Sequence, residues 1–197
     1  MKKRTRISYK ILRAILGPIF LFYYNPKIIG KENIPKDGPL IFVGNHKHVM
    51  DQNPVIICNK RPVRYMAKKE YFEGKTAWFF KATGCISVDR SKRDESAVEE
   101  AIHELNEGGC VGLFPEGTRN KTDAFLLPFK YGAVSMAKKT KATLVPFGIS
   151  GDYKFRSKNL TCIFGKPIKY DDDLDKANKK IAKAIGDLIK QGEKLNK

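Results

Sequence analysis

The residues of this chain whose types and spacing best suit chemistry are a histidine and an aspartate, His46 and Asp51, in a short polar stretch after an apolar run. An aspartate that accepts a hydrogen bond from one ring nitrogen of a histidine fixes the tautomer of the ring, and the other nitrogen can then remove a proton from a substrate. The chain contains no Gly-x-Ser-x-Gly motif, which would supply a serine nucleophile. The pair therefore predicts general-base catalysis in which the substrate's own hydroxyl attacks.

Two other interpretations of the same stretch are open at this point. His48 can also reach Asp51 across one helical turn, and a histidine in a loop is often a structural group without a catalytic role. A His-x4-Asp spacing is too short a pattern to separate these possibilities by itself.

A second stretch has the composition of an anion-binding turn. Pro115-Glu-Gly-Thr-Arg119 follows an apolar run and places an acid, a glycine amide, a hydroxyl and a guanidinium in one bend. Because a guanidinium binds phosphate oxygens in pairs, Arg119 is predicted to hold an anionic substrate group, and Arg90, at the end of another apolar run, is a second candidate. The alternative is a turn with an exposed Glu–Arg pair, which would contribute little to stability.

The hydrophobic pattern predicts the elements that position these motifs: an α/β fold with a central, mostly parallel sheet flanked by helices. The predicted strands cover residues 40–43, 63–67, 85–88, 111–114, 143–149 and 160–164. The predicted helices cover residues 52–58, 76–82, 96–107 and 131–139, and a last helix follows Asp171-Asp-Asp173 with an apolar stripe from Leu174 to Leu188. Both motifs follow strands, where parallel sheets form their sites. Pro146 predicts a bulge or a sheet edge, because proline has no backbone N–H to donate.

The N-terminal segment is predicted to bind a membrane interface. Eight cations and no acid precede Glu32: Lys2, Lys3, Arg4, Arg6, Lys10, Arg13, Lys27 and Lys31. Between them lies an apolar run that closes with aromatic residues, a composition that suits an interfacial helix. Gly17-Pro18 is expected to kink or end the first helix. We therefore divide the chain into an interfacial helical segment, residues 1–26, and a catalytic domain, residues 27–197; a helix buried on the body and a signal peptide are the alternatives.

The net charge of the chain indicates which class of partner it binds, and its cysteines indicate the state of its thiols. The net charge of +17 predicts a polyanionic partner, either nucleic acid or anionic lipid. The cations are not interleaved with stacking aromatics, and their N-terminal bias favours lipid, so no nucleic-acid partner is expected. The cysteines are scattered, which predicts reduced, intracellular thiols and no zinc site. We assign no role to His103, and Lys92 and Arg93 are interpreted as a solvated pair rather than as contacts to a donor's phosphates.

Four blocks in this order resemble those of the glycerolipid acyltransferases, specifically the 1-acylglycerol-3-phosphate acyltransferases. The blocks are His46-x4-Asp51, Gly84 to Arg90, Phe114-Pro-Glu-Gly-Thr-Arg119 and Val145-Pro146, and the resemblance covers roughly residues 38 to 150. The hexapeptide from Phe114 is the most specific of them. Position 48, commonly serine in this family, is histidine here, which bears on the local hydrogen bonds and on the preferred headgroup.

The resemblance implies transfer of an acyl chain from a thioester, acyl-CoA or acyl carrier protein, to the sn-2 hydroxyl of 1-acylglycerol-3-phosphate, without a cofactor. His46 would be the general base and Asp51 would orient it. Around them it implies the substrate-binding residues Arg90 and Arg119 for the acceptor phosphate, Glu116 and Thr118 for the glycerol site, and Gly117 and Lys130 as candidate oxyanion donors.

The resemblance also implies a membrane-associated enzyme on the cytoplasmic face of the cell membrane, with lysophosphatidate and the bilayer as partners. The nearest alternative is an acyltransferase for a different lysophospholipid acceptor. A hydrolase that uses the same base on water, and a non-catalytic basic nucleic-acid or membrane binder, are more distant alternatives.

Overall fold

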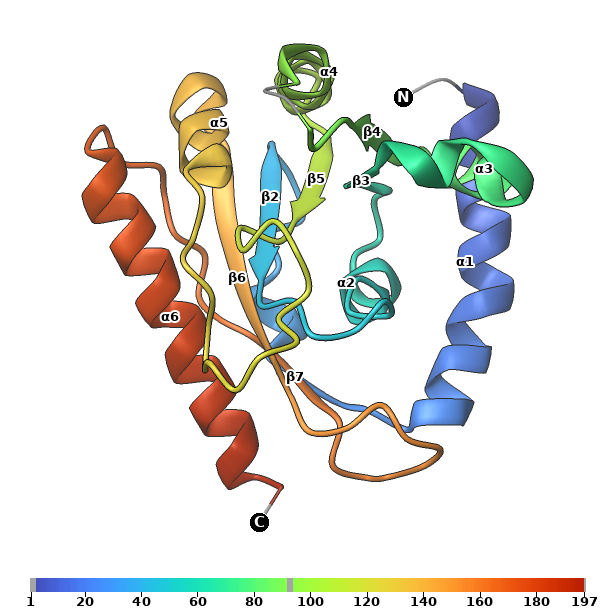
Figure 1. Ribbon diagram of the computed structural model, residues 1–197, viewed down its shortest axis with the longest axis vertical. Helices are drawn as coiled ribbons and strands as arrows, with labels where there is room; N and C mark the ends of the chain where they lie inside the picture. Colours follow the sequence, from blue (N-terminus) through green and yellow to red (C-terminus); the bar gives the residue numbers. More distant parts are fainter. Residues whose placement is uncertain (1–2, 92–93, 197) are drawn as a thin grey trace.

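A seven-stranded sheet forms the centre of the computed structural model, which describes residues 3–91 and 94–196 (Figure 1). The strands are β1 (Lys27–Ile29), β2 (Leu40–Gly44), β3 (Val63–Lys68), β4 (Ile86–Val88), β5 (Cys110–Leu113), β6 (Thr143–Ser150) and β7 (Thr161–Phe164). Their order in the sheet is β1-β7-β6-β2-β5-β3-β4, and all neighbours are parallel except β6 and β7. The predicted mostly parallel sheet is therefore confirmed; β1, only three residues long, was not predicted.

Helices cover both faces of this sheet (Figure 1). They are α1 (Lys3–Tyr24), α2 (Asn53–Cys58), α3 (Ala77–Ala82), α4 (Glu95–Asn106), α5 (Gly132–Thr140) and α6 (Leu174–Lys194), and short 3-10 turns lie at η1 (Lys31–Asn33), η2 (Lys69–Phe72) and η3 (Gly74–Thr76). Asp94 and Asp173 cap α4 and α6 by accepting hydrogen bonds from the amides of Ala97 and Lys176. The predictions for α2 to α5 are confirmed to within one residue at each end.

Two apolar cores result from the alternation of side chains along the buried strands. On β2, Ile41 and Val43 pack with residues of α4, α5 and α6. Leu40 and Phe42 belong to the second core, which includes Phe20 of α1 and Val55 of α2. Burial on both faces explains why the strands appear in the sequence as continuous apolar runs.

Pro146 lies in β6 in the interior of the sheet, where the predicted bulge is found. Leu144 pairs with Ile168, and Phe147 pairs with Phe164, so the partner segment has one residue more than β6 between these pairs. The amide of Leu144 donates to Ile168, so position 146, two residues on, presents its nitrogen to the same side. The missing N–H of Pro146 therefore faces the bulge between β6 and the segment 164–168, where no regular backbone hydrogen bond is lost.

Helix α1 runs without interruption through Pro18, so of the two outcomes expected of Gly17-Pro18, a kink or an end of the helix, the second is wrong. Proline removes the bond to the carbonyl of Ala14, but Ala14 and Pro18 both lie on the exposed side of the helix. Tyr9 and Phe20 are buried on the opposite side, and the Tyr9 hydroxyl accepts a hydrogen bond from the amide of Val63. One face of α1 is thus docked on the body.

The other face of α1 is apolar and exposed. Its residues include Ile7, Ile11, Ile15, Ile19 and Phe22. By length and composition, the segment Arg4–Tyr24 is also able to cross a membrane. The helix therefore combines features of two of the interpretations offered for it, a helix packed on the domain and an apolar surface suited to lipid.

Candidate active site

His46 and Asp51 form a direct pair in the loop after β2. The Nδ1 atom of His46 lies 2.8 Å from Oδ2 of Asp51. Asp51 is fully buried, and the same oxygen accepts hydrogen bonds of 2.7 Å from the amides of Lys47 and His48. The loop folds back on itself around this carboxylate, which fixes the imidazole in one orientation.

The second histidine of the loop has a different environment. The ring of His48 stacks on that of Tyr153 with 4.2 Å between centroids, and its Nδ1 accepts a hydrogen bond from the amide of Met50. Burial lowers the pKa of His48, and the charge of Arg119 adds to this effect against the opposing charge of Asp51. His46, and not His48, is therefore the side chain paired with the aspartate.

The imidazole of His46 is held flat and leaves one nitrogen available. It stacks on the ring of Phe114 with 4.0 Å between centroids and an interplanar angle of 7°. Its side chain is 15% exposed, and among the residues that the structure describes Nε2 has no hydrogen-bond partner. One ring nitrogen is thus fixed by a carboxylate while the other can meet a substrate, the arrangement of a general base.

Tyr153 is a functional candidate that the sequence did not reveal. It comes from the loop between β6 and β7, and its hydroxyl donates a 2.7 Å hydrogen bond to Oδ1 of Asp51. Burial, together with the charge of Asp51, raises the pKa of Tyr153, so its hydroxyl stays protonated and can donate. The two residues are separated by 102 positions, and no local pattern links them.

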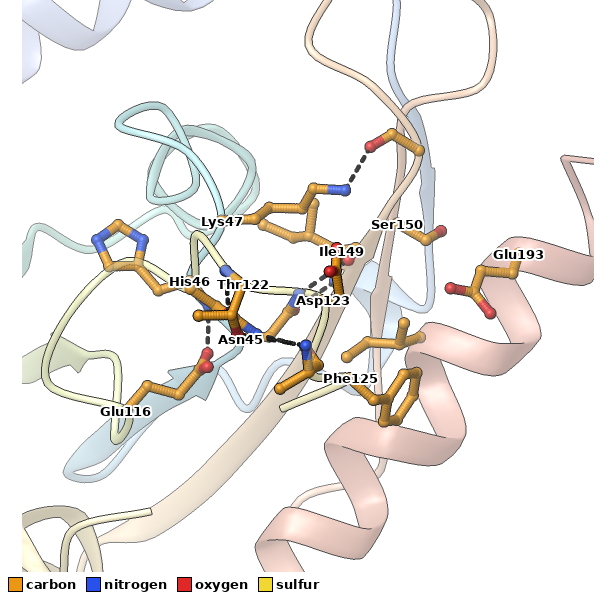
Figure 2. A pocket seen from close by; sticks show the side chains of 14 residues that line it. Asn45, His46, Lys47, Glu116, Thr122, Asp123, Phe125, Ile149, Ser150 and Glu193 are labelled. Atoms are coloured by element: carbon orange, nitrogen blue, oxygen red, sulfur yellow. Dashed lines mark hydrogen bonds between the residues drawn. The ribbon is translucent and has the colours of Figure 1, made fainter. Parts of the chain in front are cut away.

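Asn45 is a second residue whose role depends on the tertiary structure. Its side-chain amide donates to the carbonyl of Ile149 at 2.9 Å and accepts from the amide of Ile149 at 2.8 Å. This reciprocal pair of hydrogen bonds joins β6 to the start of the loop after β2, residues 45–52, which we call the catalytic loop because it holds the candidate base (Figure 2). Asparagine has both a donor and an acceptor on one planar group, which is what this backbone site requires.

Glu116 is buried and bonds to the loop that follows β2. Its carboxylate accepts hydrogen bonds from the amide of His46 at 2.7 Å and from the amide of Leu127 at 3.0 Å. The side chain is buried, and this burial raises its pKa. The amide of Asn120 also donates to the carbonyl of His46 at 2.7 Å. These bonds place the turn that begins at Pro115 directly against His46, and Glu116 holds the backbone of His46 in position.

The turn after Glu116 presents several groups that bear on anion binding. Gly117 has a φ of 72°, which favours glycine, and its amide donates to the carbonyl of Phe114 at 3.0 Å, so in this conformation it is engaged and does not serve an oxyanion. A Cβ on Gly117 would lie 2.9 Å from Cε of Lys130, so that lysine packs beside the turn. Thr118 is exposed and Arg119 half-buried, and within residues 3–91 and 94–196 neither side chain makes a hydrogen bond.

Arg90 is the one predicted site residue that lies apart from the others. It is exposed and follows β4, the edge strand, while His46 follows β2. Three strand spacings separate β2 from β4, which corresponds to about 14 Å. Because β2, β5, β3 and β4 are parallel, Arg90 and His46 both follow the carboxyl ends of their strands, but they are not neighbours. Lys92 and Arg93 lie outside the described residues.

A pocket of about 300 Å³ lies behind the catalytic loop, between the segment after Asn120 and α6. Figure 2 shows the His46 ring pointing away from Phe125 and Glu193 on its far wall. The lining combines the acids Asp123 and Glu193 with Lys47, whose Nζ donates to the carbonyl of Gly151. With two acids in its lining and its lysine already bonded to a carbonyl, this pocket is poorly suited to a phosphate.

Comparisons with known proteins show which family the chain belongs to. A family model described as Acyltransferase matches residues 25–150. The 1-acyl-sn-glycerol-3-phosphate acyltransferase of Bacillus subtilis is 31% identical over 191 residues, which cover 93% of this chain and 94% of that relative. The protein of the same name from Borreliella burgdorferi is 35% identical over 160 residues, 79% of this chain and 63% of that relative.

The fold has a counterpart among solved structures. The crystal structure of the 1-acyl-sn-glycerophosphate acyltransferase of Thermotoga maritima matches with a TM-score of 0.76 and covers 99% of this chain and 83% of that one. At 24% sequence identity this match confirms the α/β fold.

Proposed function

Because this chain belongs to the acyltransferase family, we propose that it transfers an acyl chain from a thioester to the sn-2 hydroxyl of 1-acylglycerol-3-phosphate and so makes phosphatidate. The relatives named above support the acceptor. The thioester, acyl-CoA or acyl carrier protein, is the donor that the sequence motifs favour, and the proposed reaction uses no cofactor.

The observation that carries this proposal is the His46–Asp51 pair with Nε2 of His46 unpartnered among the described residues. In the proposed reaction Nε2 takes the proton of the acceptor hydroxyl as its oxygen attacks the thioester carbonyl carbon. The resulting tetrahedral intermediate collapses with cleavage of the C–S bond, and the leaving thiolate takes up the proton from the imidazolium. Asp51 stabilises that imidazolium while it is charged.

The acceptor's phosphate is proposed to bind the cations beside His46. Arg119 is one residue from Asn120, whose amide bonds to His46, and Lys130 packs beside Gly117. These two side chains can hold an anion within reach of the base, with Thr118 available for the glycerol moiety. Lys130 is also a candidate to stabilise the oxyanion, and Arg90 would contact only a substrate that extends along the sheet edge.

We propose that the enzyme works at a membrane, on the cytoplasmic face, where a thioester donor is available. A lysophospholipid acceptor and its product both reside in the bilayer, so the enzyme must reach them from its surface. The exposed apolar face of α1 supports this placement.

Purified protein, labelled acyl thioester and lysophosphatidate test the proposal. We expect wild type to form labelled phosphatidate, and His46→Ala to lower the rate by about 10²- to 10⁴-fold, the usual contribution of a general base. His103→Ala, which changes an exposed histidine of α4, is the matched control and should retain the wild-type rate. Normal turnover by His46→Ala would contradict the mechanism.

The same assay separates the alternatives. An acceptor panel with larger headgroups distinguishes a lysophosphatidate enzyme from one that uses another lysophospholipid. Release of free fatty acid when no acceptor is present would indicate a hydrolase.

A further inference from the structure

The loop between β6 and β7, residues 151–160, combines exposed aromatic and cationic side chains. Phe155 is 58% exposed, and Lys154, Arg156 and Lys158 are exposed around it. The one acid of this stretch, Asp152, lies 3.9 Å from the Nζ atom of Lys154. The loop therefore presents an excess of positive charge around an apolar ring.

This loop is seated on the C-terminal end of α1. The ring of Phe155 packs edge-on against the rings of Phe22, at 6.5 Å, and Tyr23, at 5.1 Å. The amide of Arg156 donates to the carbonyl of Tyr23 at 2.8 Å, and its guanidinium lies 5.5 Å from the centroid of Phe22. We refer to Phe22, Tyr23, Phe155 and the three loop cations as the aromatic-cationic surface.

The chemistry of this surface fits the headgroup region of a bilayer. Phe22 is 65% exposed, and exposed aromatic rings of this size favour burial at a membrane interface, where neighbouring cations meet anionic headgroups. The surface is also continuous with the exposed apolar face of α1. We propose that the aromatic-cationic surface is a second membrane contact, which binds the headgroups of anionic lipids at the β6–β7 loop.

The position of this contact gives it a consequence for catalysis, which rests on the function proposed above. Tyr153 belongs to the same loop and donates to Asp51, and Lys47 of the catalytic loop donates to Gly151 at the loop's start. Contact here brings the bilayer close to the His46–Asp51 pair, to which the loop is joined by these two bonds. A lipid acceptor can then reach His46 without leaving the interface.

Charge removal tests the proposal in the full-length protein. We expect Lys154→Gln/Lys158→Gln to bind vesicles of phosphatidylcholine with about 30 mol% phosphatidylglycerol roughly tenfold more weakly in a flotation assay, because each lysine near such a surface contributes to binding. The matched control is Lys139→Gln/Lys179→Gln, which removes the same charge from exposed positions on α5 and α6. Equal losses in both pairs, or wild-type binding by the loop pair, would overturn the proposal.

A fluorescent probe tests insertion of the ring itself. Phe155→Trp in a Trp78→Phe background leaves a single tryptophan at the surface. Its emission should shift to shorter wavelength with the same vesicles and be quenched by brominated lipids. Emission that vesicles do not change would overturn the proposal. Neither measurement requires turnover. A protein that is inactive in the acyltransferase assay can still show this membrane contact, and an active enzyme can lack it, so the two proposals fail separately.

Discussion

Asp51 accepts hydrogen bonds from three sequence neighbours and from one distant residue. The neighbours are His46 through its ring, and Lys47 and His48 through their amides; the distant donor is the Tyr153 hydroxyl. The first three share Oδ2, whereas Tyr153 holds Oδ1. This fourth bond therefore restrains rotation of the carboxylate, on which the orientation of the imidazole depends.

Tyr153→Phe isolates that restraint, because it removes the hydroxyl and keeps the ring that stacks on His48. We expect kcat to fall by about tenfold, the order of one hydrogen bond to a charged group, with KM nearly unchanged since the residue acts through Asp51. Steady-state kinetics on lysophosphatidate measure the split. Tyr71→Phe, at an exposed tyrosine, is the control. An unaltered kcat for Tyr153→Phe would show that the restraint is dispensable.

His48 predicts a dependence of stability on pH. Its pKa is lowered in the folded protein, chiefly by burial, from an ordinary value of 6.5. As the pH falls through that value the unfolded chain takes up a proton before the folded protein does, so the free energy of unfolding decreases. Urea denaturation at about pH 8 and about pH 5.5 should show wild type losing stability relative to His48→Asn, which cannot titrate. A constant difference between the two proteins would contradict the assignment.

Among the elements, β2 and β6 position the site together. The catalytic loop begins where β2 ends, and Asn45 joins that end to Ile149 of β6. Glu116, after β5, holds the other side of the loop through the amide of His46. The site is thus assembled on three strands that pair directly or through a shared neighbour, which keeps its parts in register.

Helix α1 has two faces with separate predicted effects. Ile15→Gln/Ile19→Gln changes only the exposed face, so we expect weaker vesicle binding with an unaltered free energy of unfolding. Phe20→Ala removes a buried ring and should lower that free energy by about 3–5 kcal/mol. Flotation and urea denaturation measure the two effects. If the isoleucine pair destabilised the fold as much as Phe20→Ala, the outer face would be part of the protein core.

At the scale of the whole molecule, the net charge of +17 favours association with anionic surfaces. Binding to anionic vesicles should weaken as NaCl rises from about 0.05 M to about 0.5 M, because salt screens these charges. Some binding should persist, since the apolar face of α1 does not depend on charge. Duplex DNA should compete poorly. Steep, salt-dependent DNA binding without vesicle binding would instead support a nucleic-acid binder.

The sequence alone determined the alternation of strands and helices, because buried apolar runs and capped amphipathic segments are local patterns. It also predicted that His46 and Asp51 form a pair, because they are only five residues apart along the chain, and it singled out the turn from Glu116 to Arg119 by its composition, without indicating that Glu116 bonds to the amide of His46. The tertiary structure decided that His46 rather than His48 pairs with Asp51, that Tyr153 and Asn45 support the site, and that Arg90 lies apart. Those outcomes depend on which strands become neighbours in the sheet. That choice is made by packing between residues far apart along the chain, and local sequence patterns do not contain it.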